Sequence, residues 1–343
     1  VLLRELVPCD AEATAALRDW PRDALERAAL DLSFLAHAAV HLCSNASRVF
    51  PEALAVPFCA VSEALGRHPV LTYYSYNCCN WYRFDSGEPV RLGNIARIRN
   101  FLGGKDEEWF STVHVAVEAL AGQAIAACCA AQLEDDPSAH LVSLATSLRE
   151  MRAVLQRMDE GCDPYVYHRR VRTPMAGLDD VVYEGVASAG PGWRTGTYLG
   201  ETGAQSSVVP AIDAALGLRC ESLGENADAA AATLVPYLQT MREQYMPPKH
   251  ARLIAYLERG GPALRARCAE APRAAAAFND AVAKLAEFRK LHLSLAYRFV
   301  RKFDDRSDAA VLGTGGTAFM PYLRAHRDAT IAHAISSSSS SSS

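Results

Sequence analysis

The chain has 343 residues, 50% of them hydrophobic, which is enough to fill the core of one large domain or of a large domain carrying a smaller one. Its formal net charge is -4, from 35 basic and 39 acidic residues, so it has no surplus of positive charge to neutralise a phosphate backbone. We expect a globular protein that does not bind nucleic acid.

Helical periodicity dominates the chain. Apolar residues recur at spacings of three and four, and period-two runs of β-branched residues are scarce. This pattern predicts an all-α fold. The expected helices cover residues 23–44, 51–66, 106–133, 138–161, 205–217, 228–244, 248–259 and 272–303, and Pro51 marks the start of the second.

Two long stretches interrupt these helices. Residues 82–105 mix charge, glycine and proline, and we take them as the junction between a small N-terminal helical domain (1–104) and a large helical domain (105–335). Residues 174–203 hold seven glycines, at 177, 185, 190, 192, 196, 200 and 203, and a loop of this length usually carries function. The serines at 336–343 are expected to have no fold.

The most apolar stretch, residues 113–133, is a poor membrane span because His114, Glu118 and two glutamines interrupt it. No signal-peptide pattern opens the chain, and no helix shows the heptad seam of a coiled coil. We therefore expect a cytoplasmic protein away from the membrane, as a monomer or a weak homo-oligomer.

Ten cysteines occur, including the adjacent pairs Cys78-Cys79 and Cys128-Cys129, and no two have C-x-x-C spacing. Most lie in apolar, helix-like segments. We interpret them as reduced small hydrophobic residues rather than as a disulfide framework.

One histidine stands in the middle of an apolar helical stripe near the C-terminus. The stripe consists of Phe278, Val282, Leu285, Phe288, His292, Leu295 and Phe299. A buried neutral imidazole must satisfy both ring nitrogens, and a metal or haem iron on one of them does so. Judged by the stripe alone, a hydrogen-bonded core histidine is the simpler explanation of His292. Arg289, one turn earlier, could meet a haem propionate.

Three other histidines and one glycine-rich segment are weaker candidates. His114 shares an inward face with Phe110 and Val117, which a core residue would also do. His37 and His41 have the i, i+4 spacing of two metal ligands but lack a third, so a structural pair is preferred. The run 313–317 lacks the Lys-Ser/Thr ending of a phosphate loop, and we interpret it as a mobile loop.

Several segments resemble the indoleamine 2,3-dioxygenase branch of the tryptophan dioxygenase superfamily, and the likeness extends from about residue 24 to 330. The markers are Ala55-Val56-Pro57, Asn80-Trp81, Val182-Tyr183-Glu184-Gly185, Gln205-Ser206-Ser207, Tyr245-Met246-Pro247-Pro248 with His250, Arg289 with His292, and Gly313 through Thr317. The resemblance implies a helical haem domain with a smaller N-terminal helical domain. It also implies haem b, active as Fe(II), and insertion of both atoms of O2 across the indole C2=C3 bond of tryptophan. The product would be of the N-formylkynurenine type. No C-x-x-C-H motif is present, so the haem would be non-covalent.

The same resemblance assigns roles to individual residues. It makes His292 the proximal iron ligand, which reverses the simpler explanation given above. Cofactor contacts would come from Arg289 at a propionate, the nearby Asp213, and Thr202 with Gly203. Arg172 would hold the substrate carboxylate, which suits a planar guanidinium, and Thr317 of the closing loop would contact the amino acid part of the substrate. The remaining substrate contacts would be Tyr73 and Phe110 as aromatic walls, Thr202 and Gly316.

Departures from the branch make the expected pocket more polar. His114 stands where serine is usual, as a candidate acceptor for the indole N–H and a candidate base, so we count it with Arg172 and Thr317 as catalytic. The other departures are Tyr167 and His168 for two phenylalanines, Ser111 for another, and Tyr76 with Asn77 on the distal wall. A polar site rejects substrates that lack its partner groups. Tryptophan is therefore the default substrate and a modified indole its competitor.

Two alternatives remain at this point. One is a haem-dependent indole monooxygenase or ring-rearranging enzyme of secondary metabolism. The other is a haem-binding sensor or carrier without turnover, against which the amino-acid contacts of Arg172 and Thr317 argue.

Overall fold

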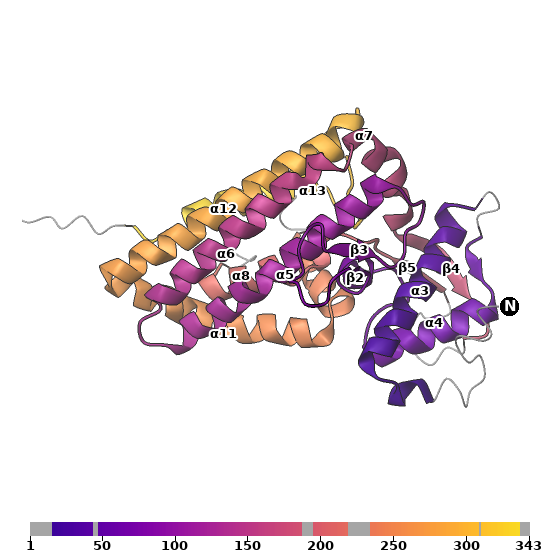
Figure 1. Cartoon of the computed structure of the whole chain (residues 1–343), viewed down its shortest axis with the longest axis horizontal. Coiled ribbons are helices and arrows are strands. Elements are labelled where there is room, and N and C mark those ends of the chain that lie inside the picture. Colours follow the sequence, from indigo (N-terminus) through magenta and orange to yellow (C-terminus); the bar gives the residue numbers. More distant parts are fainter. Residues whose placement is uncertain (1–15, 44–46, 187–194, 219–233, 309, 337–343) are drawn as a thin grey trace, which may run out of the picture.

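A computed structural model describes residues 16–43, 47–186, 195–218, 234–308 and 310–336 of the chain. The expected start of a helix at 228, the glycines at 190 and 192 and the serines at 337–343 lie outside the described residues. The expected all-α class is confirmed, because long helices form most of the molecule and the strands are short (Figure 1).

The larger part of the molecule is a helical bundle. In Figure 1 its long helices lie side by side and extend away from the N-terminal part. Its helices are α5 (Lys105–Leu133), α6 (Ser138–Gln156), α8 (Val208–Leu216), α11 (Pro248–Glu270), α12 (Pro272–Phe299) and α13 (Phe319–Ala332). Helix α6 packs against both α5 and α12, and α11 packs against α8. One continuous apolar core fills the space between them.

Helix α12 follows the predicted periodicity closely. It begins at Pro272, whose fixed φ and missing N–H suit the first helical position. Phe278, Val282 and Leu285 are buried in the bundle core, as the apolar stripe predicts. The last residues of the expected helix, Arg301–Phe303, form the separate 3-10 turn η9.

Helix α11 continues to Glu270, past the expected end at 259 and through Gly260, Gly261 and Pro262. The glycines are explained by close packing rather than by a turn. A Cβ at Gly261 would lie 2.2 Å from the carbonyl oxygen of Ala214 in α8. The glycine lets the two helix backbones approach, and Pro262 is accommodated inside the helix.

Helix α5 is the one described helix that is long and apolar enough to cross a membrane, judged by length and composition only. Val113, Ala124 and Cys128 on this helix are buried, and α6, α8 and α11 pack against it. These contacts are those of the central helix of a bundle core.

A second core lies in the smaller part of the molecule (Figure 1). Its elements are η1 (Leu17–Asp19), α3 (Arg22–His41), β1 (Val49–Phe50), α4 (Glu52–Leu65), β4 (Leu178–Tyr183) and β5 (Thr195–Tyr198). Strand β4 is central in the sheet, parallel to β1 with Val49 opposite Val182, and antiparallel to β5. Met241 and Tyr245 also contribute to this core. Segments far apart in the sequence therefore build the smaller part together.

Short elements connect the two parts. A two-stranded antiparallel sheet, β2 (Trp81–Arg83) with β3 (Ile95–Arg97), occupies the expected junction. The other connecting elements are η2 (Tyr74–Cys78), η3 (Arg157–Glu160), α7 (Pro164–Val166), η4 (Tyr167–Val171), η5 (Thr173–Met175), η6 (Gly203–Gln205), α10 (Leu234–Thr240) and η8 (Met241–Tyr245). Residues near these turns line the site described below.

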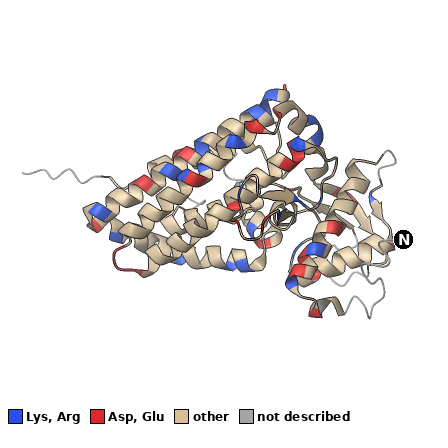
Figure 2. Cartoon of the chain, in the orientation of Figure 1, with Lys and Arg blue, Asp and Glu red and all other residues tan. Residues whose placement is uncertain are grey.

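Charged residues of both signs alternate along the helices in Figure 2, in line with the balanced composition. The eight cysteines that fall in the described ranges are all free thiols, and four of them are buried. Burial raises the pKa of the Cys59 thiol to about 12. These observations agree with the interpretation of the cysteines as reduced hydrophobic residues.

Candidate functional site

Two neighbouring cavities open inside the molecule. The larger, of about 820 Å³, lies among α8, α11, α12 and α13. The smaller, of about 180 Å³, lies among α5, α12 and the loops around residues 201 and 314. Lining residues common to both are Gly203, Ala204, His292, Tyr322 and Leu323. The imidazole of His292 therefore stands at the boundary between the two spaces.

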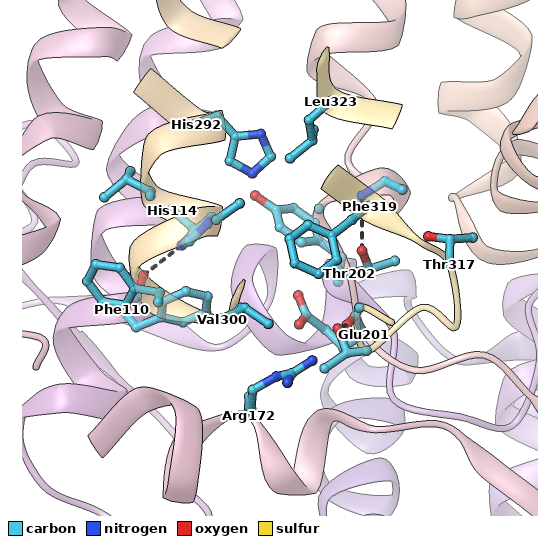
Figure 3. Close-up of a pocket in the computed structure, with 18 of the residues that line it drawn as sticks. Phe110, His114, Arg172, Glu201, Thr202, His292, Val300, Thr317, Phe319 and Leu323 are labelled. Atoms are coloured by element: carbon cyan, nitrogen blue, oxygen red, sulfur yellow. Dashed lines mark hydrogen bonds between the residues drawn. The ribbon is translucent and has the colours of Figure 1, made fainter. Parts of the chain in front are cut away.

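His292 projects from α12 with its ring toward the interior of the site (Figure 3). The side chain has a large accessible surface although protein surrounds it, because that surface faces the cavities. The ring makes no hydrogen bond to any residue that the structure describes. Desolvation lowers the pKa of His292 to about 4, with smaller contributions from His114 and Arg289, so the ring is neutral at pH 7. A neutral imidazole with a free nitrogen is the form that binds a metal.

One turn before His292, Arg289 is buried at the wall of the larger cavity. Its Nη2 donates to Asp213 Oδ2 at 2.5 Å and to His326 Nδ1 at 3.4 Å, and its Nη1 donates to Thr330. Within the described part of the chain, Asp213 Oδ1 and His326 Nε2 are buried without hydrogen-bond partners. Burial raises the pKa of Asp213, while the Arg289 guanidinium opposes this. The larger cavity thus combines apolar side chains with a buried Arg289–Asp213 ion pair, whose guanidinium can meet an acidic group of a mainly apolar cofactor.

His114, on α5, lies near His292 across the site (Figure 3). Its Nδ1 lies 2.7 Å from the carbonyl oxygen of Phe110. A carbonyl can only accept, so we assign the proton to Nδ1, and Nε2 is left as an acceptor. Desolvation lowers the pKa of His114, which keeps the ring neutral. The side chain can therefore accept a hydrogen bond from a ligand N–H.

Aromatic rings wall the smaller cavity beside His114. Phe110 packs against Tyr167 with ring centroids 4.6 Å apart, and against His114 at 4.5 Å. The hydroxyl of Tyr73 donates to Glu118 at 2.9 Å, which fixes the tyrosine ring. This wall suits a flat aromatic ligand.

Arg172 follows η4 and lies at the opposite end of the cavity from His292 (Figure 3). Its Nη2 donates to the carbonyl oxygen of Leu312 at 3.2 Å, and no carboxylate lies within ion-pair distance of it in the described chain. Most of its donors therefore remain for a ligand, and a guanidinium binds a carboxylate through two parallel hydrogen bonds.

The glycine-rich segment 313–317 is a loop, as expected, and it folds into a tight turn against the site; its mobility stays a prediction. Gly313 N donates to Thr317 O at 2.9 Å, and Gly316, with a φ of 77°, donates to Gly313 O. A hydroxyl that sequence reasoning missed holds this turn: Tyr237, on α10, hydrogen-bonds to both Thr202 and Thr317. A Cβ at Gly315 would lie 2.4 Å from the Tyr237 hydroxyl, so the glycine permits the close approach.

Glu201 is a second residue that sequence reasoning missed. It is buried, lines the smaller cavity and lies beside Arg172 (Figure 3). Its Oε1 accepts from Asn77 Nδ2 at 3.2 Å, and Asn77 Oδ1 accepts from Ser111 Oγ at 2.9 Å. Burial raises the pKa of Glu201 to about 7, although the Arg97 guanidinium and the Asn77 hydrogen bond favour the charged form. A lone glutamate in a glycine-rich loop gives no sequence signal of such burial.

Most residues that the sequence nominated converge on the two cavities. Those that line them are Tyr73, Phe110, His114, Tyr167, Arg172, Thr202, Gly203, Asp213, Arg289, His292 and Thr317. Three nominated substrate contacts lie elsewhere. Ser111 is fully buried behind Asn77, His168 packs against the ring of Phe303 at 5.2 Å, and Gly316 belongs to the turn without lining the cavity.

His37 and His41 have structural surroundings. His37 Nδ1 bonds to the carbonyl oxygen of Pro174 at 2.9 Å, and Leu71 N donates to its Nε2 at 3.0 Å. Both ring nitrogens are therefore satisfied by backbone groups. The described ranges contain no group of three side chains arranged to hold a metal ion. The preference for a structural role is confirmed for His37.

Comparison with known proteins gives a consistent result. Residues 13–333 match the family described as indoleamine 2,3-dioxygenase. Indoleamine 2,3-dioxygenase 1 of Rattus norvegicus is 30% identical over 82% of this chain and 72% of its own length. Indoleamine 2,3-dioxygenase acdA of Aspergillus candidus is 30% identical over 93% of this chain and 83% of its own length. A protein named myoglobin, of Haliotis madaka, is 28% identical over 82% of this chain and 73% of its own length.

Proposed function

The chain belongs to the indoleamine 2,3-dioxygenase family, a family of haem-dependent dioxygenases, and on that basis we propose that it oxidises L-tryptophan or a related indole amino acid. The expected product is of the N-formylkynurenine type. The observation that carries this proposal is a cavity lined by His292, by His114 with Nε2 as an acceptor, and by Arg172, which has no ion-pair partner among the described residues. His292 could bind an iron, His114 Nε2 could accept from an indole N–H, and Arg172 could bind a carboxylate.

The residues around the larger cavity fit a haem b. His292 would hold the iron through its free ring nitrogen, and Arg289 would meet a propionate. Asp213 Oδ1 and His326 Nε2, which have no hydrogen-bond partner among the described residues, would offer further polar contacts at that end, and Thr202 with Gly203 would lie along the cofactor edge. When bound in the ferrous state, the haem supplies the centre that activates O2.

The protein side chains bind and orient the substrate. Arg172 binds the carboxylate, Thr317 in its turn contacts the amino acid part, and His114 Nε2 accepts from the indole N–H. Tyr73, Phe110 and Tyr167 enclose the ring and exclude water. The lowered pKa keeps the His114 ring neutral, so Nε2 is unprotonated and can act as a weak base during ring opening.

In this proposal, Ser111 and Asn77 act on the substrate site indirectly. Ser111 holds Asn77, and Asn77 holds the Glu201 carboxylate at the cavity wall. These two polar departures therefore act through Glu201. His168 and Gly316 contribute by packing and by turn geometry.

The test is turnover by the haem-loaded, reduced protein with a panel of tryptophan and indole analogues, with product masses as the readout. We expect oxygenated products from tryptophan-like amino acids. Haem-loaded protein that converts no member of the panel would contradict the proposal.

Two alternatives have their own support. The name of the Haliotis relative suggests an oxygen carrier, for which the charged groups Arg172 and Glu201 beside the haem cavity would have no use. The polar distal wall would also suit insertion of a single oxygen atom into a modified indole. Product masses separate all three.

We further propose that the protein is cytoplasmic, a monomer or weak homo-oligomer, and acts on a small molecule rather than on nucleic acid or a membrane. The interspersed charges and the packing of α5 inside the bundle support this proposal.

A further inference from the structure

We propose that Glu201 binds the α-ammonium group of the substrate, beside the Arg172 that takes its carboxylate. The inference rests on the proposed function and deepens it. It makes the enzyme selective for zwitterionic indole amino acids over indole acids that lack the amino group.

The backbone fixes Glu201 next to Arg172. Met175 N donates to Arg172 O at 3.1 Å, and Glu201 N donates to Met175 O at 2.9 Å, so one residue ties the two segments together. On the other side, Thr314 Oγ1 donates to Glu201 O at 2.5 Å. The side chains of Arg172 and Glu201 therefore lie together at one end of the cavity (Figure 3).

The Glu201 carboxylate has one oxygen engaged and one available. Asn77 donates to Oε1 at 3.2 Å, whereas Oε2 accepts no hydrogen bond from any described residue. An ammonium group carries three donors and no acceptor, which suits a free carboxylate oxygen in a buried site.

The charges around Glu201 are balanced before any ligand binds. Arg97 forms a buried ion pair with Glu107 and also faces Glu201, while Arg172 lies on the cavity side. Two guanidinium groups thus accompany two carboxylates. A zwitterion preserves this balance, and its two charges match Arg172 and Glu201.

An indole carboxylic acid without the ammonium group would disturb the balance. Its carboxylate could still bind Arg172, but Glu201 would then keep only Arg97, which is already paired with Glu107, and would have no cation on the cavity side. A buried charge without a partner is costly, and a like charge nearby adds repulsion. Glu201 would therefore select against the desamino acid as well as for the amino acid.

The experiment compares L-tryptophan with indole-3-propionate on haem-loaded wild type, Glu201→Gln and the control Glu270→Gln, which changes an exposed glutamate at the end of α11. Binding to the ferric protein is measured by calorimetry, and kcat/KM is measured on the reduced protein. In Glu201→Gln we expect the affinity for tryptophan to fall about ten- to a hundredfold, the range of a charge-assisted hydrogen bond. The affinity for indole-3-propionate should be unchanged or higher, and Glu270→Gln should behave as wild type.

A loss of affinity for both ligands by the same factor, or for neither, would overturn the inference. Because binding is measured without turnover, a wild type that binds tryptophan selectively but does not oxidise it would contradict the proposed function alone. If the wild type oxidises tryptophan and Glu201→Gln is as selective as the wild type, only the role of Glu201 is contradicted.

If Glu201→Gln does not fold, the wild type alone supplies a second readout. The pKa of Glu201, raised by burial to about 7, makes the carboxyl increasingly charged from pH 6 to 8. The preference for tryptophan over indole-3-propionate should rise over this interval, and a flat ratio would contradict the inference. The charged or titratable groups facing Glu201 are Arg97, Arg172, Tyr73, Tyr76, Cys78 and Tyr167. Burial raises the pKa of the three tyrosines and of Cys78.

Discussion

The ring of His114 donates from Nδ1 to the carbonyl oxygen of Phe110 at 2.7 Å, within one turn of α5. This bond fixes the tautomer and leaves Nε2 as an acceptor in the cavity that His292 also lines. The position of the indole in the proposed complex follows from this pair of residues.

Replacing His114 with Ala should lower kcat/KM for tryptophan roughly three- to tenfold, the value of one neutral hydrogen bond. With 1-methyltryptophan, which has no indole N–H, the same variant should show no such loss. Steady-state kinetics with both substrates checks this, and an equal loss with both would rule out the N–H contact.

Arg172→Ala should raise KM for tryptophan by about ten- to a hundredfold, because a charge-assisted contact to the carboxylate is lost. Tryptamine has no carboxylate, so its KM should be little changed. The exposed neighbour Arg170 provides the matched control Arg170→Ala. A similar rise in KM for tryptamine would argue that Arg172 acts on the fold of the loop instead.

Because His37 is buried, we expect the free energy of unfolding to fall at acid pH. Desolvation lowers its pKa to about 3, so between pH 6.5 and 3 the unfolded chain binds a proton that the folded chain does not. The contribution of His37 to stability is complete above pH 6.5 and is lost as the pH falls, by at most about 1.4 kcal/mol per pH unit.

The measurement is the free energy of unfolding in urea at several pH values. His37→Gln should be less stable at pH 7.5 by about 1 to 3 kcal/mol, because buried backbone groups of Leu71 and Pro174 lose partners. It should also show a shallower pH dependence than wild type. The variant His140→Gln, at the half-buried start of α6, is the control. Parallel pH profiles for wild type and His37→Gln would contradict the prediction.

His292→Ala should abolish stable haem binding, since His292 is the histidine that lines both cavities. His326, the other histidine at the larger cavity, accepts from Arg289 through Nδ1. The absorbance of the haem Soret band after gel filtration measures retention, with His140→Ala as control. Retention of haem with an unchanged spectrum in His292→Ala would identify a different ligand.

Much of the fold was predictable from the sequence because the bundle helices carry strong periodicity. Helix α12 and the inward face of His292 follow directly from the spacing of apolar residues. The continuation of α11 through Gly261 and Pro262 was not predictable, since it depends on contact with α8. Helix α13 (Phe319–Ala332) was missed, and Pro321 near its start obscures where the helix begins. Strand β1 has two residues, too few to show alternation.

The sequence predicted some residues of the site and missed others. Resemblance to the family nominated residues at positions that carry its motifs, and most of them line the cavities. Glu201 and Tyr237 carry no motif, and their importance comes from contacts with Asn77, Thr202 and Thr317 in distant segments. Only the assembled fold brings these groups together.

We propose that this protein inserts dioxygen into an indole amino acid at the cavity of His292 and Arg172. The sharpest test is to incubate the reduced, haem-loaded protein with tryptophan under 18O2 and to determine the product mass by mass spectrometry. We expect a ring-opened product that carries two labelled oxygen atoms before any exchange with water. A product with a single labelled atom, or unchanged tryptophan, would contradict it.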